Sequence, residues 1–277
     1  MSSASRDASA ALPPVAEPVL GLAEGKTRGA GRTTRPDARS GLRPQAEKRI
    51  RQAPTGAFRI PTVGNFNPDG TESDLVRPCA EDINFADMAN ALSKIARFNG
   101  ICPGLAYSVA QHSVMGADAL FNETGDAVLA GYFVLHDGHE YRLGDWTRPA
   151  VDALAHFAGA CCGETEMTRP LAAFVASAVR KGVEAAKAAL DSAIWQRAGI
   201  PPIASMPAYA RQVKAMDERM LRAEGLALFG QKAAPHLPAA DLPAPRLTGA
   251  IKPWGAMKAE EAFLDRLDRY LGIVARA

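Results

Sequence analysis

His136 and Asp137 are neighbours at the end of an apolar segment, where both side chains can turn toward one metal ion. An imidazole nitrogen and a carboxylate oxygen together suit a divalent transition metal. Two more residues of the same types, His112 upstream and Asp217 downstream, lie on separate predicted helices. One metal centre would account for all four residues.

Each of these residues also has an interpretation without a metal. His112 taken alone is typical of an ordinary core or surface histidine. Asp137 follows a buried-looking run and needs a partner, which an arginine would also supply. Asp217 can pair with Lys214 or Arg219 on a solvated helix face. The metal interpretation is favoured because it explains the residues together, whereas the alternatives require separate coincidences.

Mixed nitrogen and oxygen ligation predicts Mn, Co, Fe, Ni or Zn rather than Ca, and the sequence does not choose among these metals. Four such ligands leave coordination positions for water and for a substrate oxygen. An ion of this kind lowers the pKa of its bound water and polarises a phosphoryl oxygen. Phosphoester hydrolysis requires both of these effects.

Two further carboxylates are candidates for proton transfer. Glu140 follows Asp137 by three residues, on the same face of the predicted helix, and Asp145 lies just past Gly144. One of them can orient the attacking water while the other protonates the leaving oxygen. As alternatives, Glu140 can orient a ligand histidine, and Asp145 can cap the helix that follows.

Basic and aromatic residues near these positions are candidates for substrate contacts. Arg97 ends a predicted helix, where its planar guanidinium can face a phosphate or complement the helix dipole. Lys214 and Arg148 are weaker candidates for the phosphate. Phe98 or Trp146 can stack on a base, although packing is the default for either side chain.

The elements that position these side chains are predicted to be helices, because no strand pattern of any length competes with the helical periodicity. Residues 58–80 contain several prolines and glycines and favour a loop with at most a short hairpin. Another Pro-rich loop is predicted at 231–255. The predicted helices cover 85–96, a segment that begins after an N-cap at Ser108, 127–142 with an N-cap at Asp126, 149–160, 168–198, 207–228, and a last helix with Phe263, Leu267, Tyr270, Leu271 and Val274 on one face. We expect a single all-α domain over residues 58–277.

Composition narrows the class of protein. Hydrophobic residues make up 47% of the chain and aromatic residues 6%, which favours a helical globular protein. No apolar run approaches the roughly 18 residues that span a bilayer, so no membrane partner is expected. The first 15 residues carry no apolar signal segment. We expect reduced thiols in a cytoplasmic protein, since the cysteines show no CxxC spacing: Cys79, Cys102, Cys161 and Cys162.

The basic charge is concentrated in the N-terminal segment. Residues 1–59 hold 11 of the 32 Lys and Arg and 5 of the 30 Asp and Glu, so the rest is mildly acidic. Residues 1–57 are rich in Ala, Ser, Pro, Gly and Arg, which predicts disorder. Nucleic acid is an expected partner only through this tail, and a plain unstructured extension is the favoured alternative.

Longer motifs surround the candidate ligands: Arg97-Phe98-Asn99-Gly100, Tyr107-Ser108-Val109-Ala110-Gln111-His112-Ser113, Leu135-His136-Asp137-x-x-Glu140 and Gly144-Asp145-x-x-Arg148-Pro149. In this extended form the chain resembles the HD-domain metal-dependent phosphohydrolases. The resemblance is to the subgroup that contains YfbR-like 5′-deoxynucleotidases and phage-type HD nucleotide phosphohydrolases. It covers about 80–230, and Ile251-Lys252-Pro253-Trp254 resembles the tail of the phage-type members.

The resemblance implies an all-α HD fold, a divalent metal and hydrolysis of a dNMP or dNTP. It implies Glu140 as the catalytic carboxylate, Asp145 as a second acidic group near the phosphate, and Arg97 as a phosphate contact. Phe98 replaces a Trp that lies near the sugar in the monophosphatase type. The implied ligands are His112, His136, Asp137 and Asp217.

Two other functions stay open on the sequence alone. One is hydrolysis of a different phosphoester, such as a cyclic nucleotide or a guanosine alarmone. The other is a non-catalytic nucleotide sensor or nucleic-acid accessory protein, which the presence of Glu140 and Asp145 disfavours. Base preference, the number of phosphates released and homo-oligomer formation are not determined.

Overall fold

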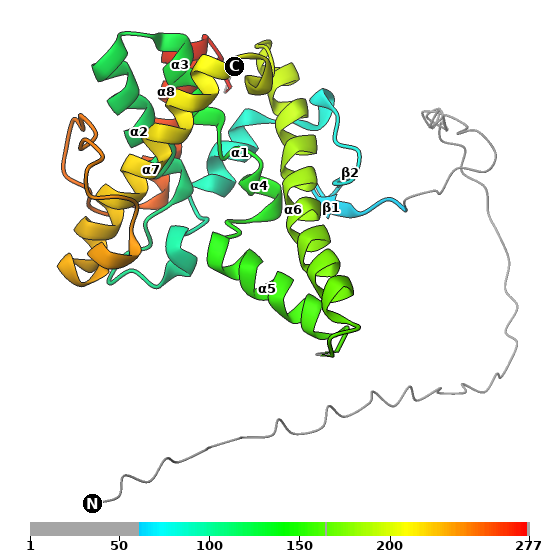
Figure 1. Cartoon of the computed structure of the whole chain (residues 1–277). Helices are drawn as coiled ribbons and strands as arrows, with labels where there is room; N and C mark the ends of the chain where they lie inside the picture. Colours follow the sequence, from blue (N-terminus) through cyan, green and yellow to red (C-terminus); the bar gives the residue numbers. More distant parts are fainter. Residues whose placement is uncertain (1–60, 164, 276–277) are drawn as a thin grey trace, which may run out of the picture. The chain divides into compact units, whose positions relative to one another are not determined.

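The computed structural model describes residues 61–163 and 165–275. These residues are mostly helical, with one short hairpin, which confirms the all-α prediction (Figure 1). The predicted disordered basic tail, residues 1–57, lies outside the described residues. None of the helices in the described ranges is long and apolar enough to cross a lipid bilayer.

Eight α-helices and two short strands follow one another along the described residues. The helices are α1 (Phe85–Leu92), α2 (Val109–Thr124), α3 (Ala127–Leu135), α4 (Glu140–Leu143), α5 (Arg148–Ala160), α6 (Arg169–Ala198), α7 (Pro207–Phe229) and α8 (Ala256–Leu271). Strands β1 (Gly64–Phe66) and β2 (Glu72–Asp74) pair antiparallel, with Asn65 opposite Ser73. This is the short hairpin that the turn-rich segment 58–80 allowed.

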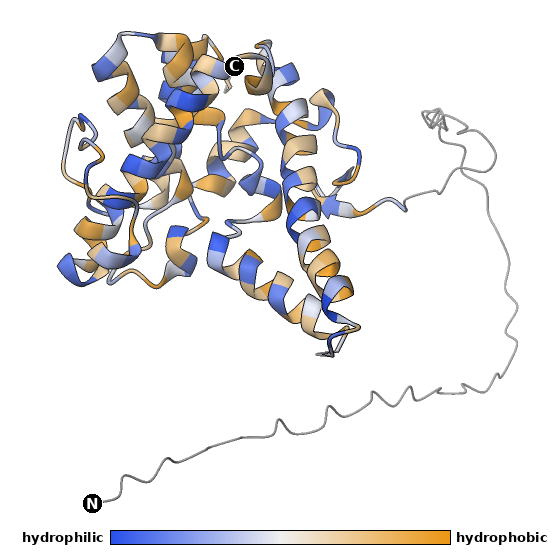
Figure 2. Cartoon of the chain, in the orientation of Figure 1, coloured by the Kyte–Doolittle hydropathy of each residue, from blue (hydrophilic) through white to orange (hydrophobic). Residues whose placement is uncertain are grey.

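The core forms where α2, α3 and α8 pack together. Helix α3 is buried from Leu129 to Leu135, in keeping with its almost uninterrupted apolar sequence (Figure 2). Helix α8 contributes one apolar face, in which Phe263 and Leu267 are fully buried. Val274 lies beyond the end of α8 and is 63% exposed, so its placement on that face was wrong.

Local sequence signals fix the starts of the two helices that lead to the candidate site. The Ser108 hydroxyl accepts a hydrogen bond from the backbone N–H of Gln111 at the start of α2. The Asp126 carboxylate accepts one from Leu129 at the start of α3. Both are N-cap bonds, which satisfy backbone donors that the first helical turn leaves free. The predicted caps are confirmed.

Close packing sets the distance between α2 and α3. Gly116 on α2 lies against the ring of Phe133 on α3, and a Cβ at Gly116 would be 2.1 Å from that ring. The absence of a side chain lets the two backbones approach. The same Phe133 ring lies 5.6 Å from the His112 ring and 4.3 Å from the His136 ring, measured between centroids. Helix packing therefore brings both imidazoles next to Phe133.

Two predicted helices end earlier than expected. The helix predicted over 127–142 stops at Leu135, and a turn separates it from α4. Gly138 N–H donates to Leu135 O and Glu140 N–H donates to Asp137 O, so i→i+3 bonds replace the helical ladder. The helix predicted over 85–96 stops at Leu92, so Arg97 does not sit at its C-terminus.

Arg97 instead lies in a 3-10 turn, Arg97–Gly100, that is tied to the start of α2. Ala96 pairs with Ser108 in an antiparallel bridge, and Arg97 N–H donates to Tyr107 O at 2.8 Å. Phe98 has a φ of 55°, a left-handed conformation that is uncommon outside glycine. This pairing holds the Arg97 side chain beside the first turn of α2.

Candidate metal centre

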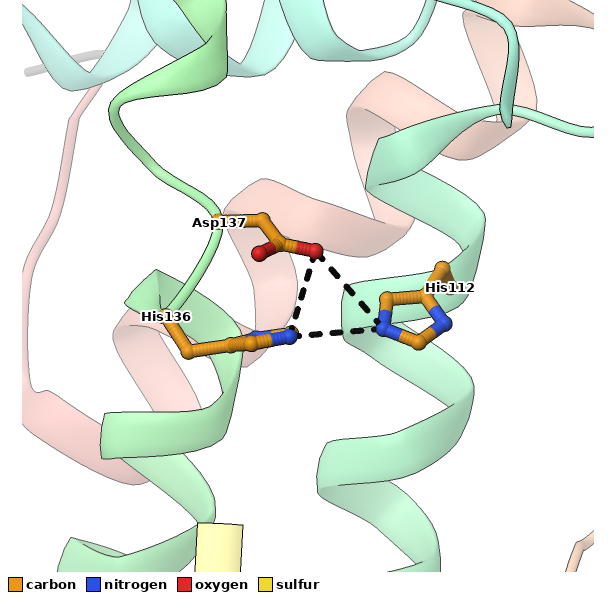
Figure 3. A group of neighbouring side chains, drawn as sticks. All are labelled: His112, His136 and Asp137. Atoms are coloured by element: carbon orange, nitrogen blue, oxygen red, sulfur yellow. Dashed lines mark hydrogen bonds and ion pairs between the residues drawn. The ribbon is translucent and has the colours of Figure 1, made fainter. Parts of the chain in front are cut away.

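Three predicted ligands meet where the first turn of α2 faces the turn after α3. The Nε2 atoms of His112 and His136 are 3.4 Å apart. The Asp137 Oδ2 atom lies 3.2 Å from His136 Nε2 and 3.8 Å from His112 Nε2. Figure 3 shows the three side chains turned toward one another. The interrupted helix matters here, because the turn directs both His136 and Asp137 toward α2.

Asp217 reaches the same place from α7. Its Oδ1 atom lies 3.3 Å from His112 Nε2 and 3.9 Å from His136 Nε2. Its side chain is 40% exposed, so it forms the open edge of the group. The alternative pairing with Arg219 is not found, because Arg219 binds Glu123 through two hydrogen bonds of 2.6 and 2.8 Å.

Both imidazoles present an unprotonated Nε2 when they are neutral. His112 Nδ1 lies 2.7 Å from Glu224 Oε1, and His136 Nδ1 lies 2.7 Å from Phe133 O. Each Nδ1–H therefore donates to its acceptor, which leaves the lone pair of each Nε2 facing the other. Two lone pairs cannot bond to each other, whereas one cation between them satisfies both.

The spacing of the donor atoms also fits one ion. Ligands that bind a transition metal at about 2.0–2.2 Å lie roughly 3–4 Å from their neighbours. The separations between the imidazole nitrogens and the carboxylate oxygens, 3.2–3.9 Å, fall in this range. His112, His136 and Asp137 can hold a metal ion, and Asp217 is placed to join them.

Glu224 is a buried residue of this site that the sequence analysis missed. It is fully buried on α7, accepts from Tyr107 at 2.9 Å and from His112 at 2.7 Å, and forms an ion pair with Arg97 at 3.2 Å. Its spacing of seven residues from Asp217, which is two helical turns, was a usable signal. A carboxylate that accepts a hydrogen bond from the histidine nitrogen that does not bind the metal fixes the orientation of the ring and raises the basicity of the ligand nitrogen.

We predict that Glu224→Gln weakens binding of Co²⁺ by roughly 10- to 100-fold, the usual effect of losing such a partner. The amide still accepts from His112 but carries no charge. Isothermal titration of the metal-free protein measures the change. The change Glu184→Gln, at an exposed position of α6, is the control and should leave affinity as it was. Equal affinities in wild type and Glu224→Gln would contradict the role.

Arg97 faces the predicted ligands and not a helix end. Its side chain is 11% exposed and lies 3.3 Å from Asp137 Oδ2 and 4.0 Å from Asp217 Oδ1. The Phe98 ring packs edge-on against Phe229, with centroids 5.2 Å apart. Lys214 is exposed one turn before Asp217 and makes no ion pair within the described part of the chain. The structure therefore brings Arg97 to the cluster and leaves Lys214 outside it.

Burial raises the pKa of both candidate acid–base residues, Glu140 and Asp145. Glu140 is 5% exposed, and burial together with Asp137 and Asp145 raises its pKa to about 9. Burial also raises the pKa of Asp145, with Asp137 adding to the effect and Arg97 opposing it. Asp145 does not cap α5, because the N-cap position is Thr147. Both carboxyl groups lie within the electrostatic reach of Asp137.

His139, which the sequence analysis left out, belongs to the same region. Its Nδ1 lies 2.9 Å from Asp191 Oδ1 on α6. Ligand atoms of His139, Asp137 and Glu140 lie within 4.8 Å of one another. Asp191 is more than fifty positions away in the sequence, so only the fold reveals this pairing.

Metal binding is expected to weaken as the pH falls. Burial alone would lower the pKa of His136, but Asp137 and Asp217 outweigh it and raise the pKa well above its usual value. The pKa of His112 is also raised, by Glu224 and Asp217, against burial and Arg97. A metal must displace these protons, so affinity rises with pH until the imidazoles are neutral. Co²⁺ titrations between about pH 5.5 and 8.5 test this, and a flat profile would contradict it.

No family model matches the chain. An uncharacterized protein of Rhodobacter capsulatus is 31% identical to it over 176 residues, which cover 61% of this chain and 75% of that protein. The two proteins belong to one family. No activity is named for this relative, so the match shows only that the two proteins are related. Any inference about the reaction has to come from the residues of the site.

Proposed function

We propose that this protein is a divalent-metal-dependent phosphohydrolase of the HD type that cleaves a phosphoester of a nucleotide, most readily a dNMP or dNTP. One observation carries the proposal. The Nε2 atoms of two imidazoles face each other at 3.4 Å, and each of two carboxylates, from α7 and the turn after α3, has an oxygen within 3.9 Å of both Nε2 atoms. The nucleotide part of the proposal rests on the extended motifs around these residues.

The charge of the cluster supports a divalent ion. Burial alone would raise the pKa values of Asp137, Asp217 and Glu224, but the imidazoles, and for Glu224 Arg97 as well, lower all three. These three carboxylates face one guanidinium, that of Arg97. With neutral imidazoles, two negative charges stay unbalanced in a largely buried site. A divalent cation removes this excess, which is costly in a medium of low polarity.

The proposed ligands are His112, His136, Asp137 and Asp217, and the ion is Mn, Co, Fe, Ni or Zn. Such an ion, when bound, activates water and polarises the phosphoryl oxygen. Arg97 places a fixed positive charge within 4.0 Å of Asp137 and Asp217, and it can stabilise charge on the phosphate oxygens.

Glu140 and Asp145 supply the proton transfers. With its pKa raised to about 9, Glu140 can hold a proton at neutral pH and release it to a leaving oxygen. The pKa of Asp145 is raised in the same direction by burial. The partner carboxylate can orient the attacking water. The cytoplasm is the proposed compartment, in line with free Cys79, Cys102, Cys161 and Cys162.

A panel of nucleotides tests the proposal. Purified metal-free protein is supplied with Mn²⁺, Co²⁺, Fe²⁺, Ni²⁺ or Zn²⁺ and with dNMPs, dNTPs, cyclic nucleotides and a guanosine tetraphosphate. Release of phosphate, pyrophosphate or triphosphate identifies both the substrate and the bond cleaved. Turnover of deoxynucleotides is expected. Turnover of cyclic or alarmone substrates alone would replace the nucleotidase assignment, and binding without any turnover would favour a sensor.

A further inference from the structure

A third imidazole lies beside the proposed ligands in the same arrangement as the first two. His139 Nδ1 is 2.9 Å from the Asp191 carboxylate, so in the neutral ring Nδ1–H donates and Nε2 keeps its lone pair. The His139 side chain is 7% exposed, and its Nε2 has no hydrogen-bond partner among the described residues. A buried nitrogen of this kind normally has a partner.

A carboxylate oxygen of the neighbouring Glu140 also lacks a hydrogen-bond partner among the described residues. Glu140 is 5% exposed, and its Oε2 forms no hydrogen bond within the described ranges. Ligand atoms of Glu140, His139 and Asp137 come within 4.8 Å of one another. One nitrogen and two carboxylates, with the imidazole ring held in place by Asp191 through Nδ1, form a donor set that suits a transition metal.

We propose that Asp137, His139 and Glu140 form a second cation site, which shares Asp137 with the first. The Asp137 Oδ2 atom makes the contacts with His112, His136 and Arg97. A carboxylate has two oxygens and can bridge two ions. The second cation would partner both unsatisfied atoms, His139 Nε2 and Glu140 Oε2.

The second site adds a second cation to the proposed function, and it rests on that proposed function because the first cation is part of it. Paired cations that share a carboxylate are a known solution for phosphoester cleavage. In the form that holds two cations Glu140 would be a metal ligand, so the proton transfer that we assign above to Glu140 and Asp145 would fall to Asp145 alone. Helix α6 gains a role, because Asp191 orients His139.

Metal stoichiometry tests the second site without any activity measurement. The full-length metal-free protein is titrated with Co²⁺, and the number of ions per chain is read by native mass spectrometry and by visible absorption. Two ions are expected for wild type. His139→Gln should bind one, because it leaves His112, His136 and Asp217 in place. Asp191→Asn should still bind two, with the second at least about tenfold weaker.

His156→Gln is the matched control, since His156 is exposed on α5, and it should bind two ions. Circular dichroism checks that each variant folds. One ion in wild type, or two ions of unchanged affinity in both His139→Gln and Asp191→Asn, would overturn the second site. A protein that binds two ions but cleaves no nucleotide would keep the second site and lose the proposed function. Nucleotide turnover with one ion would do the reverse.

Discussion

Asp217→Asn is expected to lower kcat/KM for the best nucleotide by about 10³-fold or more, with loss of the first metal. The substitution keeps the shape of the side chain but removes the negative charge 3.3 Å from His112 Nε2. A metal contributes several kcal/mol to stabilising a phosphoryl transition state, and each 1.36 kcal/mol is tenfold in rate. Metal content per chain and steady-state kinetics measure the two effects together.

The neighbouring Glu218 provides a matched control on the same helix. Glu218→Gln also replaces a carboxylate by an amide, one residue away. Glu218 itself forms no ion pair in the described structure. It should retain metal and turnover. If Asp217→Asn kept full metal content and full activity, the four-ligand centre would be wrong, even though the three-residue group of His112, His136 and Asp137 would stand.

Glu140→Gln is expected to lower kcat by about 10²- to 10⁴-fold, the range for loss of a general acid or base. The first metal should stay bound, since Glu140 is not among its four proposed ligands. The loss is expected whether Glu140 transfers a proton or holds the second cation, because glutamine can do neither well. Single-turnover kinetics with Co²⁺-loaded protein would measure the chemical step.

A buried carboxylate outside the site shows whether such a loss reflects only a weaker fold. Asp118 on α2 accepts hydrogen bonds from Arg266 and Tyr270 of α8, away from the proposed ligands. Asp118→Asn should lower thermal stability and keep kcat near that of wild type in the folded protein. If Glu140→Gln kept wild-type kcat, or lost activity only in proportion to its stability, Glu140 would have no chemical role.

The sequence by itself predicted what depends on near neighbours. The helical periodicity gave the all-α class, and the caps at Ser108 and Asp126 act over three residues, so they were visible in order along the chain. The side chains of His112, His136, Asp137 and Asp217 stood out because their types and order suit one metal.

Only the tertiary structure decided how these residues meet and what supports them. Glu224 acts on His112 across 112 positions, and Asp191 acts on His139 across 52, so no local pattern could assign either pair. The turn that interrupts the predicted 127–142 helix also needed the fold, because in a helix every backbone bond would favour continuation. Packing of α3 against α2 and the hydrogen bonds of the turn hold His136 and Asp137 toward α2. Contacts between distant segments therefore decide whether the chain continues as a helix or turns.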